Sequence, residues 1–330
     1  MKPYMCLGIE STAHTFGASV VSSEGRILSN EKRVFTTESG GIVPQQAAEH
    51  HVQHCDSVIK EALKKAKKAI KDIKLVSFSQ SPGLGHCLRI GGMAARSIAS
   101  IHKKDIIGVN HCVAHLEIGR LVTKAKDPVL LYVSGANTQV IAYEGGKYRI
   151  FGETLDMGAG NFIDTFARTL GLGFPGGPKI YELSLKSKKF IPLPYTVKGM
   201  DVSFSGLLTN LQQKHKSGKY LKEDLAFSMQ ETIFAMLVEV AERAMAHTGK
   251  EELLLGGGVA CNKRLQEMAG IMCVERGAKL FVPPNDLLVD NAAMIAWQGM
   301  LQFNAGERLK IGDAKVDPYL RTDEVNVSWR

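Results

Sequence analysis

Two histidines in residues 110–116 have the spacing of a metal site. His111 and His115 are four residues apart, so on a helix both imidazoles lie on one face, one turn apart. Such a pair can bind one transition metal ion, which normally takes at least one or two further donors. The sequence offers Tyr132, in a predicted strand, and Asp290 as candidates. The spacing therefore predicts a metal site, and the alternative is a pair of hydrogen-bonded core histidines.

A second histidine pair competes for this role. His50 and His54 have the same spacing, on a helix predicted to begin near Gln45. Only His111 and His115 follow a buried strand closely enough to face the glycine-containing loops. We therefore expect one metal ion at the first pair, and we expect His50 and His54 to line the substrate or partner surface.

Three glycine-containing loops suggest an anionic ligand. They cover residues 134–137, 171–177 and 256–258. Glycine lets backbone amides approach a phosphate closely, and a helix that follows the loop offers free N–H groups. A single loop of this kind is better explained as a tight turn, but three together predict a nucleotide. The sequence has no GxxxxGK[ST] motif and no GxGxxG motif after a strand, which argues against P-loop and Rossmann folds.

Composition places the chain among ordinary α/β proteins of the cytoplasm. It has 330 residues and a net charge of +8, which is compatible with a nucleic-acid partner. Its densest lysine cluster, at residues 60–74, reads most simply as a solvated helix face.

The six cysteines lack CxxC spacing and indicate reduced thiols. We expect no signal peptide, and no apolar run approaches the roughly 20 residues of a membrane span.

The order of predicted elements repeats within the chain. A strand, a polar loop and two further strands occupy residues 5–35, and the same pattern returns roughly 125 residues later. A strand, a loop and a helix at residues 75–96, with the helix starting around Arg89, are echoed from Leu253 to the helix after Asn262. Duplicated α/β units of this size predict two lobes that face each other across a ligand-binding cleft.

Many short motifs together resemble one family over nearly the full length of the chain. The matching stretches are residues 8–15, 40–44, 48–51, 81–85, 110–115, 132–135, 158–161 with Asp164, 174–178, 200–206, 256–260 with Asn262, 282–284 and 290–291. They resemble the archaeal and eukaryotic branch of the tRNA N6-adenosine threonylcarbamoyltransferases, formerly called O-sialoglycoprotein endopeptidases. As a set these motifs are very specific.

The resemblance implies an α/β fold of the actin/sugar-kinase/heat-shock ATPase superfamily, with two RNase H-like lobes around a central cleft. The expected N-terminal lobe covers residues 1–124 and the C-terminal lobe residues 125–304. The tail, about 305–330, is expected to pack back on the N-terminal lobe.

The resemblance also implies the site residues. One iron or zinc ion is expected at His111, His115, Tyr132 and Asp290. The residues expected to contact the substrate are Tyr132, Val133, Ser134, Gly135, Ala136, Asp164, Gly177, Tyr181 and Asn262. Two of these depart from the family pattern, since Ala136 replaces a glycine and Tyr181 replaces a carboxylate that would bind a ribose hydroxyl. Glu10 is a candidate catalytic or water-ordering carboxylate, and the alternative is a turn residue that caps local amides.

The implied reaction moves the threonylcarbamoyl group from threonylcarbamoyl-AMP to N6 of the adenosine beside the anticodon, in tRNAs that read codons beginning with A. An adenine nucleotide is therefore expected in the cleft. The family implies a KEOPS-type assembly with a small kinase-like subunit, expected here on a separate chain.

Three other functions were weighed against this one. A zinc peptidase is disfavoured because the histidine motif lacks the glutamate of HExxH. A kinase or ATPase of the same superfamily leaves the proposed metal ligands without a role. A scaffold that only binds tRNA does not require all four ligands.

Overall fold

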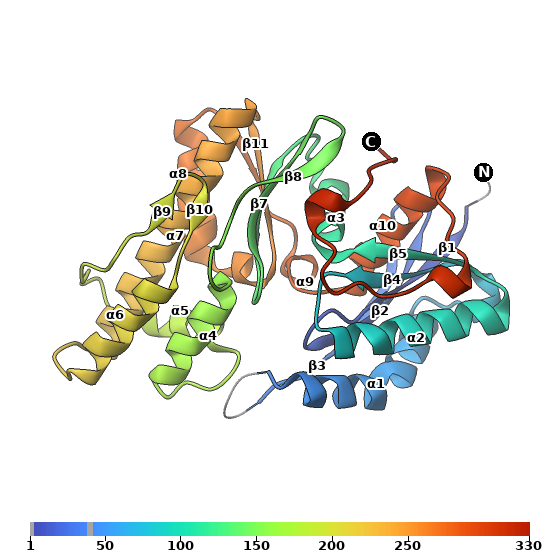
Figure 1. Ribbon diagram of the computed structural model, residues 1–330, viewed down its shortest axis with the longest axis horizontal. Coiled ribbons are helices and arrows are strands. Elements are labelled where there is room, and N and C mark those ends of the chain that lie inside the picture. The colour runs from blue at the N-terminus through green and yellow to red at the C-terminus, as the bar shows by residue number, and fades with distance from the viewer. Residues whose placement is uncertain (1–2, 38–41) are drawn as a thin grey trace.

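The computed structural model describes residues 3–37 and 42–330, so the glycines at positions 40 and 41 lie outside the described residues. Figure 1 shows two α/β lobes side by side. Each is built on a five-stranded sheet. The strand order in the first is β3 (Ile27–Val34), β2 (Thr15–Ser22), β1 (Met5–Glu10), β4 (Ile73–Ser81) and β5 (Asp105–Asn110). The order in the second is β12 (Lys279–Phe281), β11 (Glu252–Gly256), β6 (Val129–Val133), β7 (Thr138–Glu144) and β8 (Lys147–Glu153). In both sheets a meander of three antiparallel strands is extended by two parallel strands. This repeat confirms the predicted duplication.

The first sheet and its helices come mainly from the first third of the chain. The strands are β1 (Met5–Glu10), β2 (Thr15–Ser22), β3 (Ile27–Val34), β4 (Ile73–Ser81) and β5 (Asp105–Asn110), and the helices are α1 (Pro44–Lys65), α2 (Gly85–His102) and α3 (His111–Thr123). Side chains of a strand alternate between its two faces. Leu7 and Ile9 pack with α1 and α2, and Cys6 packs on the opposite face. Helix α2 begins at Gly85, four residues before the predicted start at Arg89.

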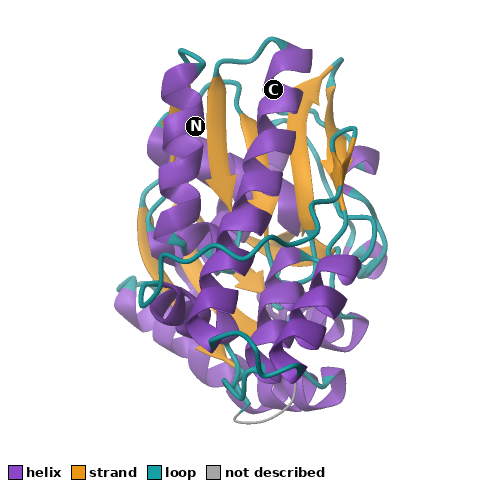
Figure 2. Cartoon of the chain, turned by 90° about the vertical axis from the view of Figure 1, so that its left-hand side faces the viewer, coloured by secondary structure: helices purple, strands orange, loops and turns teal. Residues whose placement is uncertain are grey.

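The second lobe has a larger set of helices. Its strands are β6 (Val129–Val133), β7 (Thr138–Glu144), β8 (Lys147–Glu153), β11 (Glu252–Gly256) and β12 (Lys279–Phe281), with a separate ribbon of β9 (Val197–Lys198) and β10 (Asp201–Val202). The helices are α4 (Ala159–Thr169), α5 (Gly176–Ser184), α6 (Ser205–Lys216), α7 (Lys222–Thr248), α8 (Lys263–Glu275) and α9 (Asn285–Leu288). Figure 2 shows the helices of this lobe lying over its strands.

Helix α10 (Ala292–Asn304) packs on the first sheet. The predicted boundary at residue 304 assigns it to the C-terminal lobe, but Ala293, Met294 and Met300 pack with Cys6 and Leu75 of the first sheet. The assignment of residues 292–304 is therefore corrected. The reason is physical: α10 is apolar nearly all round, so it needs a buried position, and the open face of the first sheet provides one.

The backbone of α10 lies very close to β1. A Cβ atom on Gly8 would be 2.3 Å from the carbonyl oxygen of Ala292 and 2.6 Å from the amide nitrogen of Ala296. Only glycine permits this approach. Because Asp290 lies two residues before α10, the contact also fixes where that carboxylate lies.

The tail after α10 contacts both lobes. Leu309 bridges to Ile106 of the first sheet, in the lobe on which the tail is expected to pack. Further along, however, Arg321 forms an ion pair with Glu153 of β8, and the Trp329 indole donates a hydrogen bond to Glu117 of α3. The second half of the tail therefore joins α3 to the second lobe, which the prediction did not include.

None of the helices in the described ranges combines the length and apolarity needed to cross a bilayer.

Candidate metal and nucleotide site

Helix α3 lies between the two sheets and carries both predicted histidine ligands. Ala114 and Ile118 pack with the first lobe, while Cys112 and Leu116 pack with the second. The helix starts at the interface because the Asn110 side chain accepts hydrogen bonds from the Cys112 and Val113 amides, at 3.0 and 3.2 Å. This N-cap satisfies free amide donors of the first turn and places the two histidines at the junction of the lobes.

The four predicted metal ligands lie together. One donor atom each from His111, His115 and Asp290 fall within 4.8 Å of one another. The Oδ1 atom of Asp290 is 3.3 Å from Nε2 of His111 and 3.7 Å from Nε2 of His115. The Tyr132 hydroxyl is 3.1 Å from the same His111 nitrogen. Tyr132 reaches this point because alternate residues of β6 face α3.

The chemistry of this donor set fits a metal ion. All four side chains are largely buried, and Nε2 of His115 has no hydrogen-bond partner among the residues that the structure describes. A buried polar nitrogen without a partner is costly. A metal bound to two imidazoles, a carboxylate and a phenol oxygen would satisfy it, and such a donor set suits zinc or iron.

Glu10 contacts one of the predicted ligands. It is fully buried at the end of β1, and its Oε2 atom is 3.0 Å from Nδ1 of His111. Its Oε1 atom accepts hydrogen bonds from the Thr12 amide and hydroxyl, at 2.6 and 2.5 Å. Both oxygens are thus engaged within the chain. This favours a carboxylate that caps the turn and directs Nε2 of His111 toward Asp290, over a catalytic or water-ordering one.

Electrostatics at the site follow from these contacts. Burial opposes a charge on His111, but Glu10 and Asp290 together raise the pKa of its imidazole well above the usual value. Burial also disfavours a charge on Asp290, but the nearby imidazoles of His111 and His115, at 3.3 and 3.7 Å, hold the pKa of its carboxyl well below the usual value. Burial lowers the pKa of His115. The carboxylates of Glu10 and Asp290 therefore both contact His111, and a bound cation would add further positive charge beside them.

The loop after β6 adjoins the histidines. Gly135 and Ala136 are exposed, and their neighbour Val133 is buried. The loop stays close to the start of α4, since the Gly160 amide donates to the carbonyl of Ser134 at 3.0 Å. A Cβ on Gly257, whose φ is +88°, would lie 2.3 Å from the Val133 carbonyl oxygen. Two of the three predicted glycine loops therefore meet beside Tyr132.

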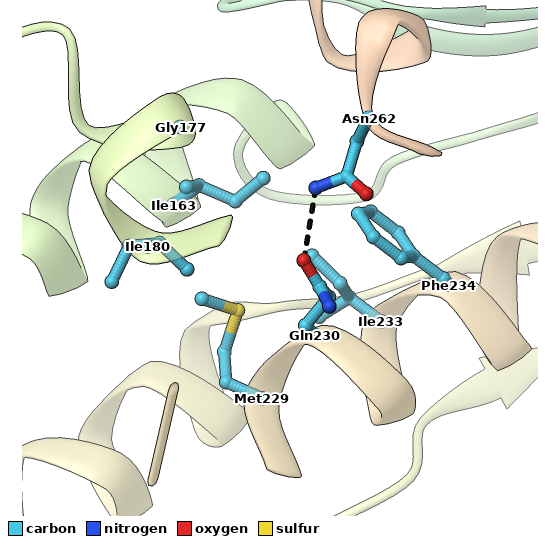
Figure 3. A pocket seen from close by; sticks show the side chains of 8 residues that line it. All are labelled: Ile163, Gly177, Ile180, Met229, Gln230, Ile233, Phe234 and Asn262. Carbon is cyan, nitrogen blue, oxygen red and sulfur yellow. Dashed lines mark hydrogen bonds between the residues drawn. The ribbon is translucent and has the colours of Figure 1, made fainter. Parts of the chain in front are cut away.

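The third glycine loop contributes differently. Only residues 171–175 precede α5, so Gly177 lies in the first turn of a helix. Asp164 fixes this turn, because its carboxylate accepts a hydrogen bond from the Gly176 amide at 2.7 Å. Gly177 and Asn262 line one small pocket of about 10 Å³ (Figure 3). Tyr181 is half-buried on α5 and does not line it.

Gln230 belongs to this pocket and was not predicted. The Asn262 side-chain amide donates to Oε1 of Gln230 at 2.9 Å, the contact drawn in Figure 3. The Asn262 oxygen in turn accepts from the Arg264 amide at 2.8 Å. No pattern in the sequence marks Gln230, since α7 also buries other polar residues such as Thr232.

The competing histidine pair lies elsewhere, on α1. The rings of His50 and His54 are 4.5 Å apart between centroids, and Nδ1 of His50 is 3.4 Å from Nδ1 of His51. Within residues 3–37 and 42–330, the one cluster of three or more potential ligands is that of α3 and Asp290. The structure therefore favours the first pair as the metal site.

Comparisons with known proteins find relatives over nearly the whole chain. A tRNA N6-adenosine threonylcarbamoyltransferase from Thermococcus kodakarensis is 57% identical over 325 residues, which cover 98% of this chain and 99% of that protein. A probable bifunctional tRNA threonylcarbamoyladenosine biosynthesis protein from Methanocaldococcus jannaschii is 50% identical, and the match covers 98% of this chain but 60% of that longer protein.

Among solved structures, HypF from T. kodakarensis superposes with a TM-score of 0.66 at 14% identity, over 91% of this chain and 47% of that one. This likeness supports the actin-like ATPase fold that was predicted, and nothing finer. The family profile of the tRNA N6-adenosine threonylcarbamoyltransferases matches residues 26–297. The chain therefore belongs to the tRNA N6-adenosine threonylcarbamoyltransferase family.

Proposed function

We propose that this chain transfers the threonylcarbamoyl group from threonylcarbamoyl-AMP to N6 of the adenosine beside the anticodon, in tRNAs that read codons beginning with A. The family membership supports the reaction. The observation that carries it is the meeting of His111, His115, Tyr132 and Asp290 beside the exposed loop at residues 134–136. A direct test is mass spectrometry of nucleosides from tRNA incubated with the donor, the protein and its partner subunits.

The chain's residues account for two parts of this reaction. The exposed backbone after Tyr132 would receive the phosphate of the donor, and Gly177 and Asn262 would contact its nucleoside. A purine is much larger than the pocket's 10 Å³, so the pocket forms only the inner wall of that site. The adenine amine attacks the carbamoyl carbon, a C–N bond forms, the C–O bond to the AMP phosphate breaks, and the amine loses one proton to solvent while AMP leaves. An exocyclic amine is a weak nucleophile, so the rate depends on positioning and charge stabilisation.

His111, His115 and Asp290, with Tyr132 in or near the coordination shell, would hold one zinc or iron ion. Such an ion supplies a Lewis acid that stabilises developing negative charge. The residues themselves keep the site dry and fix its position between the lobes.

The reaction also implies partners. We propose that tRNA binds in a KEOPS-type assembly in the cytoplasm, with a small kinase-like subunit. Relatives named bifunctional extend beyond the length of this chain, which is consistent with a functional link to a second domain. Robust modification of tRNA by this chain alone, with threonylcarbamoyl-AMP supplied, would argue against a required partner.

Gly177→Val is expected to weaken nucleotide binding without unfolding the protein. A Cβ at Gly177 meets no atom within 4 Å, so the added methyl groups would enter the space beside Asn262 that the ligand needs. Gly206→Val is the matched control, because Gly206 is also the second residue of a helix and its Cβ position is equally open. Calorimetric titration with AMP should show a loss of about tenfold or more, equivalent to roughly 1.4 kcal/mol, for Gly177→Val only.

Glu10→Gln is expected to reduce metal affinity by about 10- to 100-fold, the usual effect of losing an outer-shell partner of a ligating histidine. The amide can still fill the space, but it is a weaker acceptor for the His111 Nδ1–H group. Competition with a chromophoric chelator measures the affinity for Zn²⁺. Thr12→Val removes the hydroxyl contacts with Glu10 and, at 3.3 Å, with Nδ1 of His111, but it leaves the Glu10 carboxylate and the Thr12 amide contact in place, so it should have a smaller effect. Equal affinity in wild type and Glu10→Gln would show that Glu10 does not support the ligand.

A further inference from the structure

The positive charge of this protein is concentrated in one part of the chain. Residues 176–222 contain nine lysines and two acidic residues, Glu182 and Asp201, and so carry a net +7 of the chain's +8. The nine lysines are Lys179, Lys186, Lys188, Lys189, Lys198, Lys214, Lys216, Lys219 and Lys222. This segment comprises α5, the β9–β10 ribbon and α6. Charge is thus nearly balanced over the rest of the molecule.

These lysines are exposed and almost free of acidic partners. All are exposed except Lys214, which is half-buried. Of these nine lysines, Lys189 alone forms an ion pair within the described residues, a 3.8 Å contact with Asp224. The lysine cluster predicted from the sequence, at residues 60–74, differs, because Lys60 pairs with Asp56 and Lys65 with Glu31. Eight of the nine lysines in residues 176–222 therefore lack an acidic partner in the part of the chain that the structure describes, compared with five of the seven in residues 60–74.

The position of this surface relates it to the cleft. Helix α5 begins at Gly176, next to the pocket lined by Gly177 and Asn262. Figure 1 shows α5 and α6 on the outer side of α4. The twelve residues of α6 extend for roughly 18 Å. Over such a length a nucleic-acid duplex presents on the order of ten phosphate charges.

At the far end of α6 the surface is hollowed and includes an aromatic ring. A groove of about 240 Å³ is lined by Lys214, Lys219 and Tyr220 with three uncharged polar residues. The Nζ atom of Lys214 lies 5.0 Å from the centroid of the Tyr220 ring. Between α5 and α6, Phe190 and Tyr195 are 53% and 48% exposed. Lysines interspersed with exposed aromatic rings are typical of surfaces that bind nucleic acid.

We propose that residues 176–222 form a basic surface that binds the phosphate backbone of tRNA and holds its anticodon stem while the loop enters the cleft. This inference rests on the proposed function, which makes tRNA the acceptor. Charge complementarity identifies the occupant: a net +7 with a single ion pair among the described residues, Lys189 to Asp224, attracts a polyanion, and each phosphate contact releases counterions. The contact is to the backbone, so it determines affinity and orientation and does not read the sequence.

The test compares two triple charge reversals in the full chain. Lys214→Glu/Lys216→Glu/Lys219→Glu alters the proposed surface, and Lys64→Glu/Lys67→Glu/Lys68→Glu changes the charge equally on and after α1. Fluorescence anisotropy with labelled tRNA, at several salt concentrations, measures affinity.

For the first variant we expect a loss of tRNA affinity of about tenfold or more, and a salt slope reduced by about 0.9 for each lost contact. The second variant should stay close to wild type. AMP affinity and thermal unfolding should be unchanged in both, and the neutral Lys→Gln triple replaces any variant that fails to fold.

Steady-state kinetics of the assembled complex separates this proposal from the proposed function. Absence of the modified nucleoside with the wild-type complex would count against the function itself. An active wild type whose first variant has unchanged tRNA affinity and KM would overturn the basic surface, as would equal losses in both variants. A first variant that keeps tRNA affinity but loses an acidic partner subunit would also overturn it, by assigning the surface to a protein. A raised KM for tRNA with unchanged kcat would support it.

Discussion

His111→Ala is expected to abolish metal binding and to lower transferase activity by about 100-fold or more. The variant removes one of three nitrogen and oxygen donors that lie within 4.8 Å of one another, and it leaves the Asp290 carboxylate and the unpartnered His115 nitrogen without a common partner. Lewis-acid stabilisation by a bound ion is worth several kcal/mol, and each 1.36 kcal/mol is about a factor of ten in rate. Elemental analysis gives the metal content, and the nucleoside assay gives the activity.

His50→Ala is the matched control for this experiment. It also removes one imidazole of an i, i+4 pair, but from α1, where no third ligand gathers in the part of the chain that the structure covers. We expect full metal content in this variant. Retention of the metal by His111→Ala together with its loss in His50→Ala would show that the ion lies at the other pair.

Gly8→Ala is expected to destabilise the fold by at least about 1–3 kcal/mol, the usual cost of overpacking a well-packed core. The new methyl group would be 2.3 Å from the Ala292 carbonyl oxygen and 2.6 Å from the Ala296 amide nitrogen. Both are backbone atoms, so α10 must move away from β1 to accept it. Because Asp290 lies two residues before α10, we also expect metal affinity to fall. Urea unfolding gives the free energy, and chelator competition gives the affinity.

Gly17→Ala offers a close comparison on the adjacent strand. Its Cβ would be 3.5 Å from the nearest atoms, two of which belong to Ala292, and this is an ordinary van der Waals distance. We expect a change between roughly zero and a stabilisation of 0.4–1 kcal/mol, because alanine reduces the entropy of the unfolded chain. If both variants lowered the unfolding free energy equally, the close approach of α10 to Gly8 would not be the cause.

Local features of this protein were predictable because backbone geometry alone produces them. The period of the α-helix places His111 and His115 on one face in any context, and the structure has the predicted helix α3. The repeated strand–loop–strand pattern likewise predicted two similar sheets, which the structure confirms. The family resemblance supplied Tyr132 and Asp290 as partners of the histidines, and the structure brings all four together.

Other features depend on contacts between residues far apart in the sequence, for which no local pattern exists. Helix α10 packs on the first sheet because its apolar side chains must be buried. This packing places Asp290, which precedes the helix, beside His111 of α3. Glu10 reads equally well as a catalytic or a capping carboxylate until its two oxygens are seen to contact Thr12 and His111. Lysine counts can be read from the sequence, but only the tertiary structure decides which lysines have acidic neighbours. In residues 60–74, Lys60 and Lys65 have acidic partners, whereas in residues 176–222 only Lys189 has one within the described ranges. An ion pair requires two charges within a few ångströms in space, whatever their distance along the chain.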